Sequence, residues 1–160
     1  MAPWADALYA CDYDWWKANA GVPEFAGLKI SQDVDTQRRY PEVKKVDCVR
    51  ERDDILLTQA GRIGWGGNSG FHALNLAAQF AASKIILVGY DMRLDQGLHW
   101  HGKHPNGQNN PLAKNIDRWR KAIDQAAPVF EALGVPVINA SSASALMAYP
   151  KMTFREAMRC

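Results

Sequence analysis

The sequence has few cysteines, no long apolar run and no concentration of charge of one sign, and each absence excludes a class of protein. Three cysteines, Cys11, Cys48 and Cys160, are odd in number and far apart, which fits a reducing compartment and neither a disulfide framework nor a CxxC metal site. We interpret Cys11 and Cys48 as packed thiols. No run approaches the roughly 18 apolar residues that a membrane span needs, and no basic segment followed by an apolar stretch opens the chain. We therefore expect a cytoplasmic protein with no membrane partner.

The charge is nearly balanced, with 19 basic and 17 acidic side chains and a net charge of +2. The longest basic tracts are the pairs Arg38–Arg39 and Lys44–Lys45, so the sequence offers no surface for nucleic acid. A small-molecule partner is the expectation. A length of 160 residues fits one domain, and no linker or repeat divides it, so we predict a single domain over residues 1–160.

The second half of the chain has the pattern of strands alternating with helices. Residues 69–82 have a helical face, with Asn68 or Ser69 placed to cap its start. Residues 83–91 form a continuous apolar run, typical of a central parallel strand. Residues 112–134 predict a helix that Pro128 bends and Gly134 ends, and residues 135–141 predict a short strand. This alternation predicts a parallel sheet.

The first half is less regular. Its plausible strands are residues 6–12, 28–33 and 43–50, with a short helix over residues 13–21 between the first two. Together the two halves predict one three-layer α/β domain, with a mainly parallel sheet of about five strands and helices on both faces.

A glycine-rich segment comes just before the predicted helix at 69–82. The start of a helix exposes unpaired backbone N–H groups beside the positive end of the helix dipole, which attracts phosphate. Glycines would let a phosphate approach closely, and Asn68 and Ser69 could add side-chain donors. The segment is neither a P-loop nor a G-x-G-x-x-G turn directly after a strand, and the alternative is a capped turn without a ligand. The predicted phosphate-binding residues are Gly66, Gly67, Asn68, Ser69 and Gly70.

A histidine-rich segment follows the predicted strand at 83–91. In open parallel sheets, ligands bind outside the carboxyl ends of the strands, where Asp91, His99, His101 and His104 are expected. Such groups could act as a general acid or base near neutral pH, and we take these four as the candidate catalytic residues. The alternative is a polar loop that meets only solvent. We predict no metal site, because an extended HxH directs its side chains to opposite faces and helical i, i+4 spacing is missing.

Three further groups of residues have open interpretations. The aromatic residues of the amino end fit core packing or an interface, with base stacking as the alternative. Asp12 follows the first predicted strand and has the position of a helix N-cap. Asn139, Ser141 and Ser142 follow the last predicted strand and could face the same crevice, although the start of a helix would explain them equally well.

Four stretches together, APWADALYACDYDWW, residues 66–92 (GGNSGFHALNLAAQFAASKIILVGYDM), HWHGKHP and VINASSASALMAYPKMTFREAM, resemble a group of uncharacterised phage and prophage proteins with a Rossmann-like domain. That group is distantly similar to bacterial sialyltransferase-like glycosyltransferases and to archaeal 6-hydroxymethylpterin pyrophosphokinase-like proteins. The more distant similarity rests on the Ser-Gly helix start and the Gly-x-Asp strand end. It implies that Ser69 and Gly70 meet a nucleotide phosphate, that Tyr90–Asp91 end the corresponding strand, and that a histidine of the next loop is the base.

The chain departs from this resemblance at its start. Relatives begin with a strand, a GGGPSL-like turn and a second strand before the Ala-Pro-Trp-Ala-Asp segment, and this chain starts at Met1 directly before that segment. We therefore expect a sheet that lacks its usual first strands and has exposed edges, which favour a homo-oligomer. The resemblance also implies the host cytoplasm as the location of a phage-encoded protein.

Three functions remain open at this point. The first is a glycosyltransferase-like or pyrophosphokinase-like enzyme that consumes a nucleotide or nucleotide sugar. The second is a nucleotide-binding module without turnover. The third is a truncated, non-catalytic phage protein with a structural or oligomeric role. Fold analogy alone does not decide among them.

Overall fold

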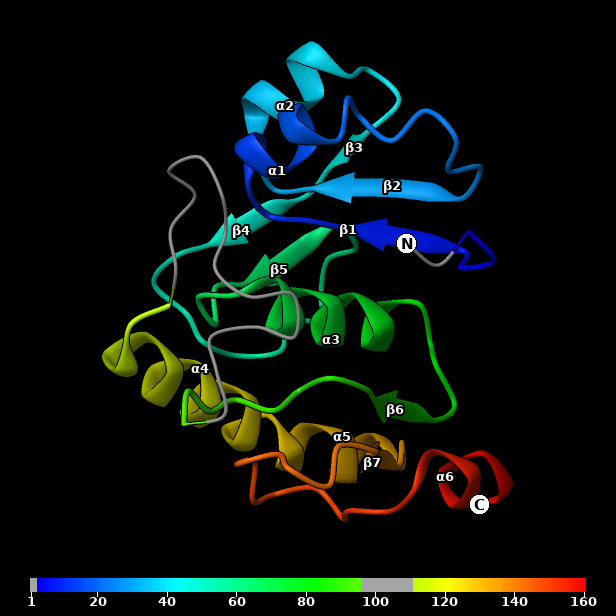
Figure 1. The fold of residues 1–160 in the computed structure, drawn as a ribbon, viewed down its shortest axis with the longest axis vertical. Coiled ribbons are helices and arrows are strands. Elements are labelled where there is room, and N and C mark those ends of the chain that lie inside the picture. The colour runs from blue at the N-terminus through cyan, green and yellow to red at the C-terminus, as the bar shows by residue number, and fades with distance from the viewer. Residues whose placement is uncertain (1–2, 96–110) are drawn as a thin grey trace.

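The computed structural model describes residues 3–95 and 111–160, and these have a mixed α/β fold with parallel strand pairing (Figure 1). The elements follow in the order β1 (Ala7–Tyr9), α1 (Tyr13–Ala18), β2 (Leu28–Ser31), α2 (Val34–Arg39), β3 (Lys44–Lys45), β4 (Asp47–Val49), β5 (Arg62–Gly64), α3 (Ser69–Gln79), β6 (Ile85–Leu87), α4 (Ala113–Gln125), α5 (Ala127–Leu133), β7 (Val137–Asn139) and α6 (Phe154–Arg159). The predicted α/β class and parallel pairing are confirmed.

The strands form three small sheets in place of the one expected sheet of about five strands. One has the order β1–β2–β3, and the other two are the pairs β4–β5 and β6–β7. The first two sheets adjoin, because one short segment serves both: Val46 N donates to Ser31 O at 2.9 Å, and Asp47 N donates to Gly61 O at 2.8 Å. Each described strand has at most four residues, and none of those in the first two sheets pairs with β6 or β7.

The expected central strand over residues 83–91 is wrong in its extent and its neighbours. Only Ile85–Leu87 is extended, as β6, and it pairs with β7 alone among the described strands. Ile85 and Leu87 point into the core, whereas Val88 is 62% exposed. Gly89 then adopts a φ of +75°, a left-handed conformation that ends the strand. The apolar run therefore reflects alternate burial of two side chains and not a strand covered on both sides.

The predicted helix over residues 69–82 is confirmed as α3, which ends at Gln79. Asn68 is its N-cap, with an extended backbone, and its side-chain oxygen accepts a hydrogen bond from Phe71 N at 2.9 Å. Ala81 has a φ of +56° and takes the chain out of the helix. In Figure 1, α3 lies between the strands of the amino half and the β6–β7 pair.

The predicted helix over residues 112–134 is confirmed as two consecutive helices. α4 ends at Gln125 and α5 begins at Ala127, with Pro128 in its first turn. A proline in the first turn needs no N–H partner, whereas inside one long helix it would remove a hydrogen bond. Gly134 ends α5 in a left-handed conformation with a φ of 66°, as predicted.

Three apolar clusters support these elements. The largest packs α3, α4 and α5 around β6 and β7 through Phe71, Leu74, Leu87, Ile123 and Phe130, among others. A second cluster surrounds Trp16, which is fully buried, so core packing is the use of this aromatic residue. Trp4, in contrast, is 84% exposed. A third cluster lies between β2, β5 and α3.

Candidate functional site

The segments that follow β1 and β6 meet at the start of α3. Cys11, just past β1, donates its backbone N–H to Ser69 Oγ at 3.2 Å. Tyr90, just past β6, donates its hydroxyl to Gly70 O at 2.9 Å. Both contacts lie at the carboxyl ends of parallel strands, the edge where open α/β sheets bind ligands. Tyr90, in the segment after β6, therefore contacts the start of α3.

The segment after β7 joins the same edge. Gly89 N donates to Ser141 Oγ at 2.8 Å, and Ser144 Oγ donates to the Tyr90 carbonyl oxygen at 2.5 Å. Asn139 is fully buried, and its side-chain oxygen accepts from Ser141 N at 3.0 Å. Its side-chain nitrogen has no hydrogen-bond partner among the described residues. Residues 139–144 therefore form a turn against β6 and not the start of a helix.

Four backbone amides of the glycine-rich segment, here called the open amides, have no acceptor within the described residues, and of the four residues Gly66 is buried. Trp65 N donates to Arg52 O at 2.6 Å, and Phe71 N donates to the Asn68 side chain. By contrast, the amides of Gly66, Asn68, Ser69 and Gly70 donate no hydrogen bond within the residues that the structure describes. The amides of Asn68, Ser69 and Gly70 lie at the positive end of the α3 dipole, where an anion is stabilised.

The side chains of Asn68 and Ser69 hold the segment in place. Besides capping α3, Asn68 donates its side-chain N–H to Gly66 O at 3.1 Å. The Ser69 hydroxyl donates to Cys11 Sγ at 3.0 Å while it accepts from Cys11 N. Both side chains have protein partners, so the open donors of this segment are its backbone amides. A role for either side chain toward a phosphate stays a prediction.

The three glycines are also required by packing. A Cβ atom on Gly66 would lie 2.0 Å from the Phe71 ring, and one on Gly67 would lie 2.8 Å from the Trp119 indole nitrogen. A Cβ atom on Gly70 would lie 3.0 Å from the Tyr90 ring. Packing alone therefore explains why glycine occupies these three positions, without any ligand. The predicted capped turn and the predicted phosphate segment are thus both compatible with the geometry.

Two arginines border the segment. Arg118, on α4, forms an ion pair with Asp53 at 2.9 Å, and its Nη1 lies 3.4 Å from the position of a Cβ on Gly67. The Arg50 guanidinium lies 4.8 Å from the centre of the Trp65 ring. Both arginines are exposed, so their charges can reach a ligand at the surface. The electrostatic surroundings of the open amides therefore include the Arg50 cation and the Arg118–Asp53 ion pair.

Two carboxylates lie at the same edge. Asp91 is exposed, and its backbone oxygen accepts from Ala145 N at 2.8 Å. Asp12 has the N-cap position of α1, as predicted, but its exposed side chain makes no capping hydrogen bond. Of the candidate catalytic residues, only Asp91 is described; His99, His101 and His104 lie outside the described residues. Whether they face the open amides stays a prediction.

The fourth histidine, His72, forms a buried connection that sequence reasoning missed. His72 Nε2 lies 2.5 Å from Trp65 O, and its Nδ1 lies 2.8 Å from the Tyr9 hydroxyl. The carbonyl can only accept, so Nε2 carries the proton and Nδ1 accepts from Tyr9. Burial lowers the pKa of His72 to about 4, so the ring is neutral at pH 7. His72 thereby fastens α3 to β1 and to the glycine-rich segment.

The two internal cysteines lie beside this connection. Cys48 Sγ is 3.7 Å from His72 Nε2 and 3.6 Å from Gly64 O. Burial raises the pKa of the Cys11 thiol to about 12 and that of Cys48 to about 11. A thiolate is the reactive form, so both are inert near neutral pH. Both are free and partly buried, which agrees with their interpretation as packed thiols.

Within residues 3–95 and 111–160, no group of three or more His, Cys, Asp or Glu side chains could hold a metal ion. None of the helices in those two ranges is long and apolar enough to cross a membrane.

No family model, curated protein or solved structure matches the chain. The resemblance to the phage Rossmann-like group therefore stays a prediction, and the geometry of the edge itself must support any function.

Proposed function

We propose that the segment from Gly66 to Gly70 binds the phosphate of a nucleotide or nucleotide sugar. The supporting observation is the set of four backbone amides, of Gly66, Asn68, Ser69 and Gly70, that make no hydrogen bond within the described residues. Backbone N–H groups at a helix start bind phosphate because they donate hydrogen bonds and add the field of the helix dipole.

The surroundings of the amides support the same proposal. Arg118 and Arg50 add positive charge near a bound phosphate, and arginine forms paired hydrogen bonds with phosphate oxygens. The strand ends that meet here give a ligand contacts from several elements. The nucleoside or sugar would extend along this edge toward Tyr90 and Asp91.

The reaction that suits this arrangement is group transfer from a phosphorylated donor, within a Rossmann-like domain. In the glycosyltransferase version, an acceptor hydroxyl attacks the sugar carbon and the nucleotide phosphate leaves. Asp91 or a histidine among His99, His101 and His104 would accept the hydroxyl proton, while the open amides would stabilise the charge that builds on the phosphate. In the pyrophosphokinase-like version, the same amides would hold the transferred pyrophosphoryl group.

A thermal-shift panel of nucleotides, nucleotide sugars and inorganic pyrophosphate tests the proposal. A ligand at a hundred times its dissociation constant stabilises the folded state by about 2.7 kcal/mol, which raises the melting temperature by several degrees. A shift with product formation supports the transferase, and a shift without turnover supports a binding module. If no compound in the panel shifts the melting temperature, phosphate binding is wrong.

A structural or oligomeric role is the second proposal, and two observations favour it. The first is that ring contacts at Gly66, Gly67 and Gly70 explain the glycines without a ligand. The second is that β1 and β6 each pair on one side only among the described strands, and open edges promote association. Sedimentation of the full chain over a range of concentrations tests it. A monomer at every concentration would exclude a homo-oligomer.

A further inference from the structure

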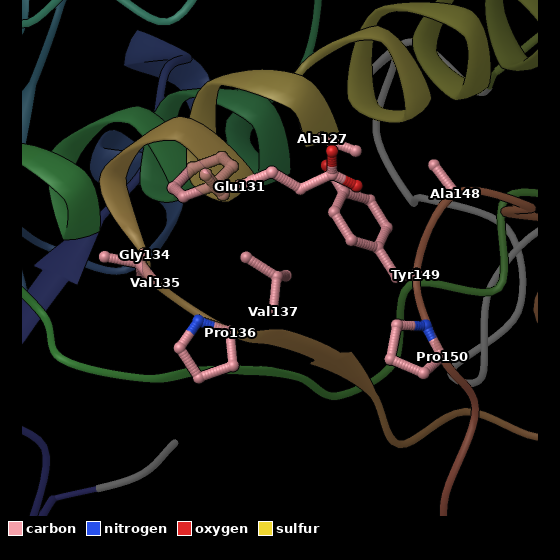
Figure 2. A pocket seen from close by; sticks show the side chains of 10 residues that line it. Ala127, Glu131, Gly134, Val135, Pro136, Val137, Ala148, Tyr149 and Pro150 are labelled. Carbon is pink, nitrogen blue, oxygen red and sulfur yellow. The ribbon is translucent and has the colours of Figure 1, made fainter.

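A pocket lies at the amino end of β7, away from the carboxyl-end edge described above. Its volume is about 310 Å³, at the lower limit of the roughly 300–1,000 Å³ typical of small-molecule sites. It opens where residues 148–150 diverge from β7: Asn139 N still donates to Pro150 O at 2.9 Å, whereas Val137 makes no hydrogen bond to that segment. Figure 2 shows the pocket between α5, the start of β7 and residues 148–150.

The walls of the pocket are apolar and offer few hydrogen-bond donors. Phe130, Val137 and Tyr149 line it with apolar side-chain surface, and the two prolines, Pro136 and Pro150, have no N–H group. The Tyr149 hydroxyl is already used, because it donates to Ile123 O at 2.6 Å. The pocket therefore suits an apolar body.

One charge is present in the lining. Of the ten lining residues, Glu131 is the one that carries a charge, and none is basic. Its side chain runs from α5 across the rim toward Tyr149 in Figure 2. Glu131 is exposed, and its carboxylate makes no hydrogen bond or ion pair within the described residues. The backbone N–H and C=O of Val137 both point away from β6, because Pro136 O and Ala140 N make the bonds to that strand.

We propose that this pocket binds a small organic cation, specifically a primary ammonium group on an apolar body. The apolar body fills the space between Phe130, Val137 and Tyr149, where burial drives binding. The ammonium group, which has three donors and no acceptor, lies at the Glu131 carboxylate on the rim. Glu131 repels an anion, and a neutral ligand gains no attraction from the carboxylate charge. The proposal does not depend on phosphate binding at the Gly66–Gly70 segment.

Titration of the full-length ¹⁵N-labelled protein with 2-phenylethylammonium, 2-phenylethanol and 3-phenylpropionate tests this assignment by NMR. We expect saturable shifts of residues 127–137 and 148–150, with the ammonium compound binding more tightly than the alcohol and the carboxylate most weakly. Glu131→Gln should weaken ammonium binding by roughly two- to fivefold, as expected for an exposed ion pair, and leave the alcohol unchanged. Glu24→Gln, at another exposed acid, is the matched control.

Ala148→Phe provides a second test, because Ala148 lines the pocket but is exposed, so a larger side chain fills the space without disturbing the core. It should abolish binding of both the ammonium and the alcohol while the melting temperature is maintained. The proposal is overturned if none of the three probes binds saturably, or if Glu131→Gln leaves the ammonium affinity unchanged. Concentration-dependent dimerisation of the wild type that Ala148→Phe removes would also overturn it, since a second copy would then occupy the pocket.

Discussion

The Tyr9 hydroxyl lies 2.8 Å from Nδ1 of His72, in the interior between β1 and α3. Through the same ring, His72 Nε2 donates to Trp65 O, so one side chain connects the first strand, the helix and the glycine-rich segment. The open amides of that segment depend on this connection for their position. Loss of the two His72 hydrogen bonds would therefore disturb the candidate site as well as the fold.

The buried His72 ring makes stability depend on pH. Burial lowers its folded pKa to about 4 from an ordinary value of 6.5, so the unfolded chain takes up the proton first as the pH falls. The contribution of the neutral His72 ring to the free energy of unfolding is fully present above pH 6.5. It is lost as the pH falls from 6.5 to 4, a loss of about 3 kcal/mol. Urea unfolding at both pH values should show this loss in the wild type, in excess of that in His72→Gln. A His72 ring that titrates near pH 6.5 by NMR would contradict it.

Gly66 should tolerate no side chain. Gly66→Ala combines a left-handed φ of 47° with a Cβ only 2.0 Å from the Phe71 ring, so we expect a loss of about 3 kcal/mol in the free energy of unfolding. Gly61 is the matched control, since its φ is +76° and a Cβ there meets nothing within 4 Å. Gly61→Ala should lose only about 1 kcal/mol by chemical denaturation. Equal losses in the two variants would show that the Phe71 contact is not tight.

The two helix N-cap side chains at this edge should contribute differently to the free energy of unfolding. Asn68→Ala removes the acceptor of the Phe71 N–H and should lower the free energy of unfolding by about 1 kcal/mol. Asp12→Ala removes a side chain at the N-cap of α1 that makes no capping bond, so its effect should stay within about 0.5 kcal/mol. Chemical denaturation of both variants measures the difference. A larger loss for Asp12→Ala would mean that its carboxylate has a partner in the folded state.

Local patterns in the sequence predict the helices of the second half well. Asn68 or Ser69 before an amphipathic run predicts the start of α3, and Pro128 with Gly134 predicts the bend and the end of the α4–α5 pair. α6 was missed, although Thr153 and Glu156 form a capping box that a search for S/T-x-x-E would find. α2 was missed as well, although Asp33 caps it by accepting from Thr36 N at 2.7 Å.

Features that depend on distant residues could not be predicted. β5 has three residues, Arg62–Gly64, too few for a periodic pattern, and its pairing with β4 crosses a long irregular segment. Buried Asn75 illustrates the same limit: its side-chain oxygen accepts from both Leu56 N and Gly64 N at 3.0 Å, so it satisfies that segment from α3. The contact between Tyr9 and His72 spans 63 positions and has no local signal. The division into three sheets also depends on pairing between residues that are distant in the sequence, so no local pattern predicts it.

The most direct test of phosphate binding compares two substitutions at Ser69. Ser69 is the first residue of α3, where proline is tolerated, and Asn68 already has the extended backbone that precedes a proline, with φ −154° and ψ 156°. Ser69→Pro removes the hydroxyl and one open amide, whereas Ser69→Ala removes only the hydroxyl. With the nucleotide, nucleotide sugar or pyrophosphate that shifts the wild-type melting temperature, Ser69→Pro should bind roughly ten- to a hundredfold more weakly than Ser69→Ala. Equal affinities in two folded variants would contradict binding through the amides of this segment.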